Sequence, residues 1–71
     1  MNNQQKPETP AEIHYYEVVR NMSLADIQRI QANEVSANEC VQSPKMTAAV
    51  DAWRAILVER GQDPGLMHHQ V

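Results

Sequence analysis

The segment from residue 43 to residue 61, SPKMTAAVDAWRAILVERG, carries both a start signal and a stop signal for one helix. Ser43 can accept hydrogen bonds from the free N–H groups of a first turn, and the fixed φ of Pro44 suits the first helical position. Gly61 can adopt the left-handed conformation that ends a helix, and Arg60 complements the negative end of the helix dipole. The sequence therefore predicts a single helix between these signals.

The apolar side chains of this helix recur at intervals of three or four residues, which places them on one face. They are Met46, Ala49, Val50, Trp53, Ile56 and Leu57. Trp53 is the only tryptophan of the chain, and its large ring gains much from burial. We expect Val50, Trp53 and Leu57 to pack in a core against the preceding helices.

Thr9 and Glu12 form the pattern of a capping box, with Pro10 at the first helical position between them. A helix is therefore expected to begin near residue 10. Its apolar residues fall on two stripes: one holds Ile13, Tyr16 and Val19, and the other holds Tyr15, Val18 and Met22. Two apolar faces predict burial from both sides, in a bundle or between two subunits. The residues expected to bind a partner are Tyr15, Tyr16, Val19 and Met22.

Ser23 followed by Asp26 predicts a second helix start. The apolar residues after it, expected on one side of the helix, are Leu24, Ile27, Ile30, Ala37 and Val41, with Val35 near the edge. We assign Leu24, Ile27 and Ile30 to the core. Because the intervening residues 32–38 are polar and favour caps and turns, we expect helix to about Gln31 and a bent continuation to about Val41. Whether residues 10–42 form one helix or two stays open.

These patterns predict an all-α protein, a small helical bundle of two long or three shorter helices. Residues 1–8 are expected to be a disordered N-terminal segment, residues 9–61 the helical domain, and residues 62–71 a C-terminal turn and tail. Three oppositely charged pairs at a spacing of three residues are typical of solvated helix faces. They are Glu17–Arg20, Asp26–Arg29 and Asp51–Arg54.

A chain of 71 residues has little surface to bury in a core of its own. Chains of this size commonly need a disulfide, a metal or self-association for stability. Cys40 is the only cysteine, so an internal disulfide is impossible, and a lone cysteine suits a reducing cytoplasm. We therefore expect a homo-oligomer, with a dimer favoured, in the cytoplasm.

Six Lys and Arg residues are outnumbered by nine Asp and Glu residues, and no two basic residues are adjacent. This distribution argues against nucleic-acid binding, which needs clustered cations. No apolar run is long enough to span a membrane. His14, His68 and His69 lack the spacing of a metal site, and Cys40 lacks a recognisable catalytic base. We expect no enzyme activity, no cofactor and no metal.

These observations favour a small module that binds another protein by occupying its surface, in the style of accessory or inhibitory proteins of phages and mobile elements. One alternative is a dimeric regulator that resembles a helix-turn-helix protein and contacts DNA through Ser36–Gln42, although that segment contains no cation. A third possibility is a site for a small anionic ligand at an oligomer interface, built from Arg20 or Arg29.

Overall fold

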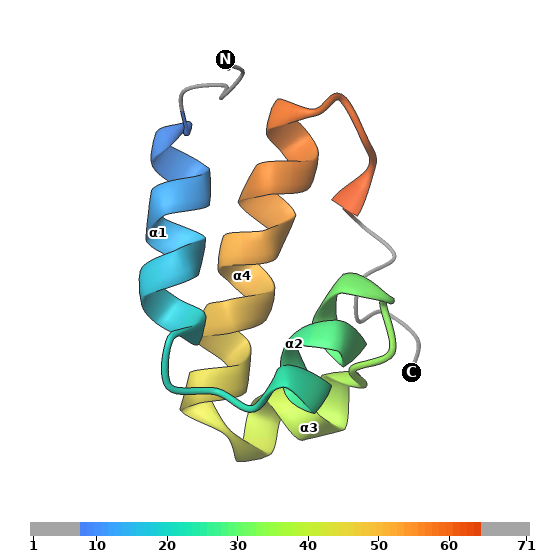
Figure 1. Ribbon diagram of the computed structural model, residues 1–71. Helices are drawn as coiled ribbons and strands as arrows, with labels where there is room; N and C mark the ends of the chain where they lie inside the picture. Colours follow the sequence, from blue (N-terminus) through green and yellow to red (C-terminus); the bar gives the residue numbers. More distant parts are fainter. Residues whose placement is uncertain (1–7, 65–71) are drawn as a thin grey trace.

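The computed structural model describes residues 8–64, which contain four α-helices and no strand (Figure 1). The helices are α1 (Pro10–Val19), α2 (Leu24–Gln31), α3 (Ala37–Gln42) and α4 (Pro44–Glu59). The predicted all-α class is confirmed, with four helices in place of the expected two or three. In this part of the chain, no helix combines the length and the apolar character that a membrane span requires.

Every described helix starts at a hydroxyl side chain that accepts a hydrogen bond from the backbone N–H three residues later. The four capping residues are Thr9, Ser23, Ser36 and Ser43. Thr9 and Glu12 form the predicted capping box, and Ser36 and Glu39 form a second one. The caps at Thr9, Ser23 and Ser43 confirm the predicted helix starts. The cap at Ser36 lies within residues 32–38, which the sequence predicts to favour caps and turns.

Two helices end in the same hydrogen-bonded turn, in which one residue takes a positive φ. In α4 this residue is Gly61, with a φ of 75°, and the N–H of Gln62 donates to the carbonyl of Leu57. In α2 it is Asn33, with a φ of 62°, and the N–H of Glu34 donates to the carbonyl of Arg29. Asparagine tolerates this conformation better than other residues with a side chain. Asn33 therefore separates α2 from α3, so residues 10–42 form three helices.

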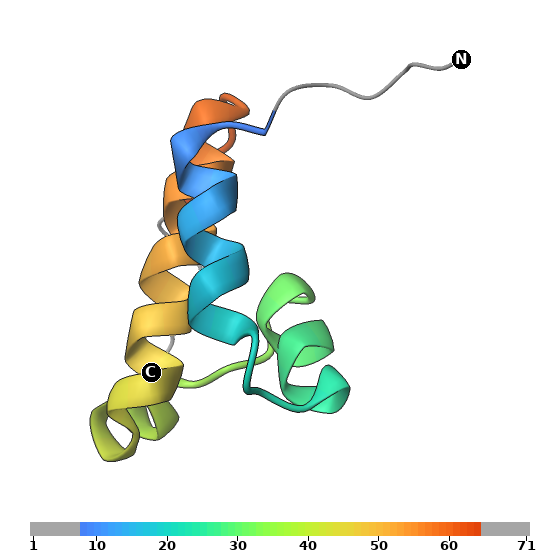
Figure 2. The ribbon, with the colours of Figure 1, turned by 60° about the vertical axis from the view of Figure 1, so that its left-hand side comes forward.

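Helices α1 and α4 lie side by side and run in opposite directions (Figures 1 and 2). Their outer ends are joined by polar contacts, since the Thr9 hydroxyl donates to Glu59 Oε1 at 2.6 Å and Arg60 lies 3.7 Å from Glu12. The described core forms one cluster centred on this pair. Its buried members are Tyr15, Val19, Ile30, Val35, Met46, Ala49, Val50, Ala52 and Ile56.

The apolar face predicted for α4 is confirmed: Met46, Ala49, Val50 and Ile56 are buried, and Trp53 and Leu57 pack against them. Helix α1 differs from the prediction because it buries one face only. Tyr15 and Val19 are 2% and 6% exposed, whereas Ile13 and Tyr16 are 45% and 50% exposed. Only one side of α1 contacts α4, so the stripe that holds Ile13 and Tyr16 stays partly in solvent.

Helices α2 and α3 contribute less to the core than expected. Ile30 is fully buried and Ile27 packs against the core, as predicted, but Leu24 is 67% exposed. Leu24 is rotated by about 120° from Ile30 around the helix axis, so both cannot face α4. Val41 is 82% exposed, because the turn at Asn33 redirects the chain and ends the face that α2 began. Leu24 was thus wrongly assigned to the core.

Candidate binding surface

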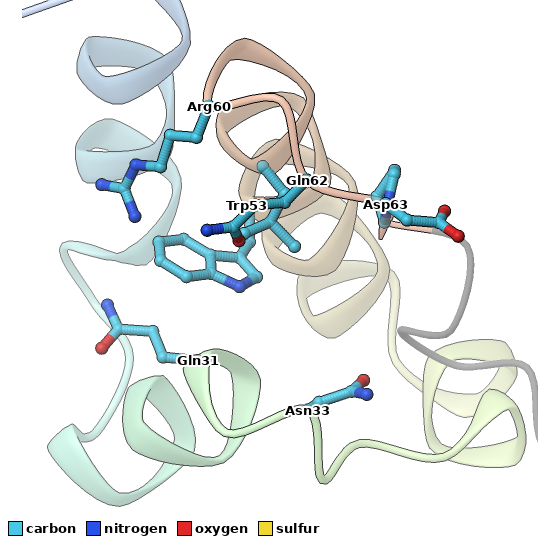
Figure 3. A pocket seen from close by; sticks show the side chains of 8 residues that line it. Gln31, Asn33, Trp53, Arg60, Gln62 and Asp63 are labelled. Carbon is cyan, nitrogen blue, oxygen red and sulfur yellow. The ribbon is translucent and has the colours of Figure 1, made fainter.

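A hollow of about 260 Å³ lies where the end of α2, the second half of α4 and residues 61–64 come together (Figure 3). We refer to it as the Trp53 hollow. Its lining residues are Gln31, Asn33, Trp53, Leu57, Arg60, Gln62, Asp63 and Pro64. The turn that follows α4 creates this hollow, because Gly61 directs the chain back along the helix toward α2.

The indole of Trp53 lies at the centre of this arrangement, between Arg60 on one side and Gln31 on the other (Figure 3). Trp53 is partly buried, and its ring centroid lies 5.3 Å from that of the buried Tyr15, with the rings tilted by 47°. One part of the indole thus packs on the core and another is accessible in the hollow. A tryptophan in this position can contact a ligand without first leaving the core.

The guanidinium carbon of Arg60 lies 5.4 Å from the centroid of the Trp53 ring, a cation–π geometry. The same guanidinium is 3.7 Å from a carboxylate oxygen of Glu12 in α1. These contacts orient a long side chain that is otherwise half exposed. Arg60 therefore presents planar N–H donors at the rim of the Trp53 hollow, beside an aromatic ring.

Gln31 forms the opposite rim of the hollow. It is held there because its Nε2 donates a hydrogen bond to the hydroxyl oxygen of Tyr15 at 3.1 Å. The phenol of Tyr15 is buried, and loss of solvation raises its pKa above the ordinary value although this hydrogen bond lowers it. Tyr15 is thus a neutral core residue, and its hydroxyl holds Gln31 at the edge of the hollow. The remaining carboxamide atoms of Gln31 can pair with a ligand.

The exposed Tyr16 extends the aromatic surface along α1. Its ring centroid is 5.9 Å from that of Tyr15, which in turn stacks near Trp53. The rings of Tyr16, Tyr15 and Trp53 therefore form a row across α1 and α4, and Arg60 lies beside Trp53 at its end. We call the accessible part of this arrangement, formed by Tyr16, Trp53, Arg60 and Gln31, the aromatic surface.

The structure divides the four residues predicted to bind a partner. Tyr16 is exposed, Met22 is partly buried against the core, and Tyr15 and Val19 are interior. The expectation that Tyr15 and Val19 lie on a surface is wrong, because both point toward α4. Their contribution to the site is indirect, through the packing of Trp53 and the position of Gln31.

Neither Gln31 nor Arg60 is among the residues predicted from the sequence to bind a partner. A signal for Arg60 was present, because residues seven apart on a helix lie only about 20° apart around its axis. Trp53, Leu57 and Arg60 therefore share one stripe of α4. No comparable signal exists for Gln31, which reaches the hollow only because α2 packs across α4.

Cys40 in α3 is partly buried, and its thiol pKa is raised by desolvation, with smaller contributions from Asp51 and Glu39. The thiol is therefore protonated at neutral pH. Within residues 8–64, no group of three potential metal ligands is close enough to hold an ion. His14 lies on the exposed side of α1, and His68 and His69 lie outside the described residues.

Helices α2 and α3 are joined by a turn, as the helix-turn-helix alternative requires. Arg29 of α2 contacts α3, because its guanidinium forms ion pairs with Asp26 and with Glu39 of α3. These pairs raise the pKa of Arg29 and lower that of Glu39, in both cases mainly through their mutual hydrogen bond. Arg29 thus joins the two helices and is not directed outward from α3.

Comparison of the chain with protein-family models, with curated protein sequences and with solved structures gave no significant match to any of them. The case for a function therefore depends on the geometry of the residues described above.

Proposed function

We propose that this protein is a small, non-enzymatic interaction module that binds a segment of a partner protein at the aromatic surface. The observation that carries the proposal is the position of Trp53, which packs on the core while its indole remains accessible at the centre of the hollow. Tryptophan, tyrosine and arginine are the residue types most enriched among those that dominate binding energy in protein interfaces. The aromatic surface contains one residue of each type: Trp53, Tyr16 and Arg60.

The rim suits a peptide backbone because it offers both donors and acceptors. Gln31, Asn33 and Gln62 carry carboxamides, which can pair with the N–H and C=O groups of an extended segment. Arg60 and Asp63 add one charge of each sign, so the rim does not select a strongly charged ligand. A largely apolar peptide segment fits this site: one of its side chains would enter the hollow and pack on Trp53 and Leu57. Its backbone would form hydrogen bonds with the polar groups of the rim.

The mode of action would be occupancy. A core that orders Trp53 before binding reduces the entropy lost when a partner docks, which helps a module with a small surface. The protein would then block or tether the partner segment that it covers. An accessory or inhibitory role in the cytoplasm, as the composition suggests, is part of this proposal.

A random-peptide display library, selected against the purified protein, provides a direct test. Enriched peptides are expected to share an apolar or aromatic residue and to change the fluorescence of Trp53, which is the only tryptophan in the chain. Arg60→Ala removes the contact over the indole without altering a buried residue. We expect this variant to bind the selected peptides at least tenfold more weakly, a loss of about 1.4 kcal/mol.

Val58→Ala is the matched control, because Val58 lies on the same helix and is 60% exposed outside the hollow. It should bind the selected peptides like the unaltered protein. Peptides that bind equally to the unaltered protein and to Arg60→Ala, with no change in Trp53 fluorescence, would place the binding site elsewhere and contradict the proposal. Melting curves of both variants check that the fold is retained.

A further inference from the structure

Helix α1 contacts both rims of the Trp53 hollow, although none of the described residues that line this hollow belongs to α1. The rims are Arg60, at the end of α4, and Gln31, at the end of α2, on opposite sides of the indole (Figure 3). Each rim is in contact with a different residue of α1. Glu12 forms an ion pair with Arg60, and Tyr15 forms a hydrogen bond with Gln31.

The carboxylate of Glu12 uses its two oxygens for two different contacts. Its Oε1 accepts a hydrogen bond from the N–H of Thr9 at 3.0 Å, which closes the capping box of α1, and its Oε2 lies 3.7 Å from Arg60. The cap ties this carboxylate to the helix backbone and so fixes its direction. Glu12 is therefore an ordered partner for a guanidinium that is itself half exposed and lies over Trp53.

Tyr15 contacts the second rim from a fixed position in the core. It is almost fully buried, and its ring centroid lies 5.3 Å from that of Trp53. Its hydroxyl oxygen accepts the hydrogen bond from Gln31 Nε2 at 3.1 Å. Gln31 itself is exposed, and Ile30 is the only buried residue of α2. The position of the Gln31 carboxamide therefore depends on this hydrogen bond, since burial does not restrain it.

We propose that α1 sets the width of the Trp53 hollow and thereby selects which partner side chains enter it. Glu12 and Tyr15 are three residues apart, so they share one face of α1 and lie about 4.5 Å apart along its axis. Arg60 and Gln31 come from different helices, and in the described part of the chain no hydrogen bond joins them directly. The spacing of the two rims is therefore set by their contacts with one rigid helix.

Glu12 and Tyr15 are thus positioning residues, because they act on a ligand only through Arg60 and Gln31. A hollow held at one width discriminates between side chains by size, since a larger one must displace a rim and a smaller one leaves part of the indole uncovered. The selection of side chains rests on the function proposed above. The control of the width does not, and it can be measured in the protein alone.

Two conservative substitutions release one rim each. Tyr15→Phe removes the hydroxyl and keeps the buried ring, whereas Glu12→Gln removes the charge and keeps a carboxamide oxygen that can complete the capping box. Acrylamide quenching of fluorescence measures the accessibility of the indole, because Trp53 is the only tryptophan. A released rim leaves the indole more open, so the quenching constant should rise about 1.5-fold or more in each variant.

Thr47→Val and Glu59→Gln are the matched controls, because neither residue lines the hollow. Thr47→Val removes a hydroxyl that donates to the carbonyl of Cys40, a hydrogen bond between α4 and α3. Glu59→Gln removes a carboxylate charge but keeps an acceptor for the hydroxyl of Thr9. Both controls should quench like the unaltered protein, and melting curves of all four variants check that the fold is retained.

Peptides selected at the hollow separate a change of width from a general loss of stability. The apolar residue of the best selected peptide is exchanged for valine and for phenylalanine, and calorimetry gives the ratio of the two affinities. Tyr15→Phe and Glu12→Gln should each shift this ratio about threefold toward the phenylalanine peptide. General destabilisation would weaken both peptides alike, and an unchanged ratio would therefore contradict the selection by size.

The quenching experiment gives a result even without a ligand. A quenching constant that stays unchanged in Tyr15→Phe or in Glu12→Gln, or that rises as much in the two controls, would overturn the proposal. Failure to enrich any peptide would contradict the proposed function instead, and quenching alone would then decide whether α1 controls the width.

Discussion

The antiparallel pair α1–α4 and the two short helices α2 and α3 are stabilised by different kinds of interaction. The pair buries a continuous row of apolar side chains. Seven of the nine buried core residues belong to it, five in α4 and two, Tyr15 and Val19, in α1. Helices α2 and α3, with the turn between them, add only Ile30 and Val35 to the buried core. Their other contacts are mainly polar and include the caps, the ion pairs of Arg29 and the hydrogen bond from Gln31 to Tyr15.

This difference matters for function because the Trp53 hollow lies between the two regions. Trp53, Leu57 and Arg60 belong to the rigid pair, whereas Gln31 and Asn33 belong to the less firmly held region. Regions with few buried apolar contacts open at lower free-energy cost than the core does. Movement of α2 would therefore change the width of the hollow without disturbing Trp53.

The largest expected effect is that of Ile56→Ala. Ile56 is 1% exposed in the middle of the contact between α4 and its neighbours, and its truncation leaves a cavity. We expect a loss of about 2–5 kcal/mol in the free energy of unfolding, measured by chemical denaturation. Val58→Ala, on the exposed side of the same helix, should change it by no more than about 0.5 kcal/mol. Equal effects of the two substitutions would contradict the assigned core.

Ile30→Ala distinguishes the two regions more sharply. Ile30 is fully buried and is the main apolar anchor of α2. The loss should be about 2–3 kcal/mol, at the low end for such truncations, because loosely held helices can move to fill part of the cavity. Hydrogen exchange should show faster exchange at residues 24–42 and little change in α1 and α4. Uniform acceleration throughout the chain would mean that the two regions unfold as one unit.

Substitutions at Asn33 probe the turn that separates α2 from α3. Valine is strained at a positive φ, so Asn33→Val should cost about 1–2 kcal/mol, whereas Asn33→Gly should be close to neutral or stabilising. Gly61→Ala offers a comparison in α4, since an added Cβ would meet no atom within 4 Å and only the backbone conformation opposes it. The melting temperatures of the three variants measure these changes in stability. A stable Asn33→Val would show that this turn does not require the left-handed conformation.

The smallest expected effect concerns the ion pairs between α2 and α3. The hydrogen bond from Arg29 lowers the pKa of Glu39, so the folded protein holds this proton less tightly than the unfolded chain does. The resulting stabilisation is present above the unfolded pKa of about 4.3 and is lost as the pH falls through the lower folded value. Glu39→Gln should therefore lower the melting temperature slightly at neutral pH, and this difference should shrink steadily as the pH is lowered below about 4.3. A difference that persists in acid would exclude the ion pair as its cause.

Sequence patterns predicted three of the four described helix starts and missed the capping box of Ser36 and Glu39 that begins α3. The starts at Thr9, Ser23 and Ser43 and the stop at Gly61 depend on hydrogen bonds between residues a few positions apart. The assignment of Leu24 to the core failed because a stripe of three residues drifts around a helix. The stripe of Leu24, Ile27 and Ile30 therefore does not show by itself which of these residues contacts the neighbouring helix.

The sequence by itself determined where α1, α2 and α4 begin, where α4 ends and which face of α4 is apolar, because these properties arise within a few turns of chain. Only the tertiary structure decided which of the two apolar stripes of α1 is buried, since both were suitable and the choice depends on the position of α4. It also decided the candidate site. Gln31, Trp53 and Arg60 meet because α2 crosses α4 and the chain turns back at Gly61, contacts that no local spacing encodes.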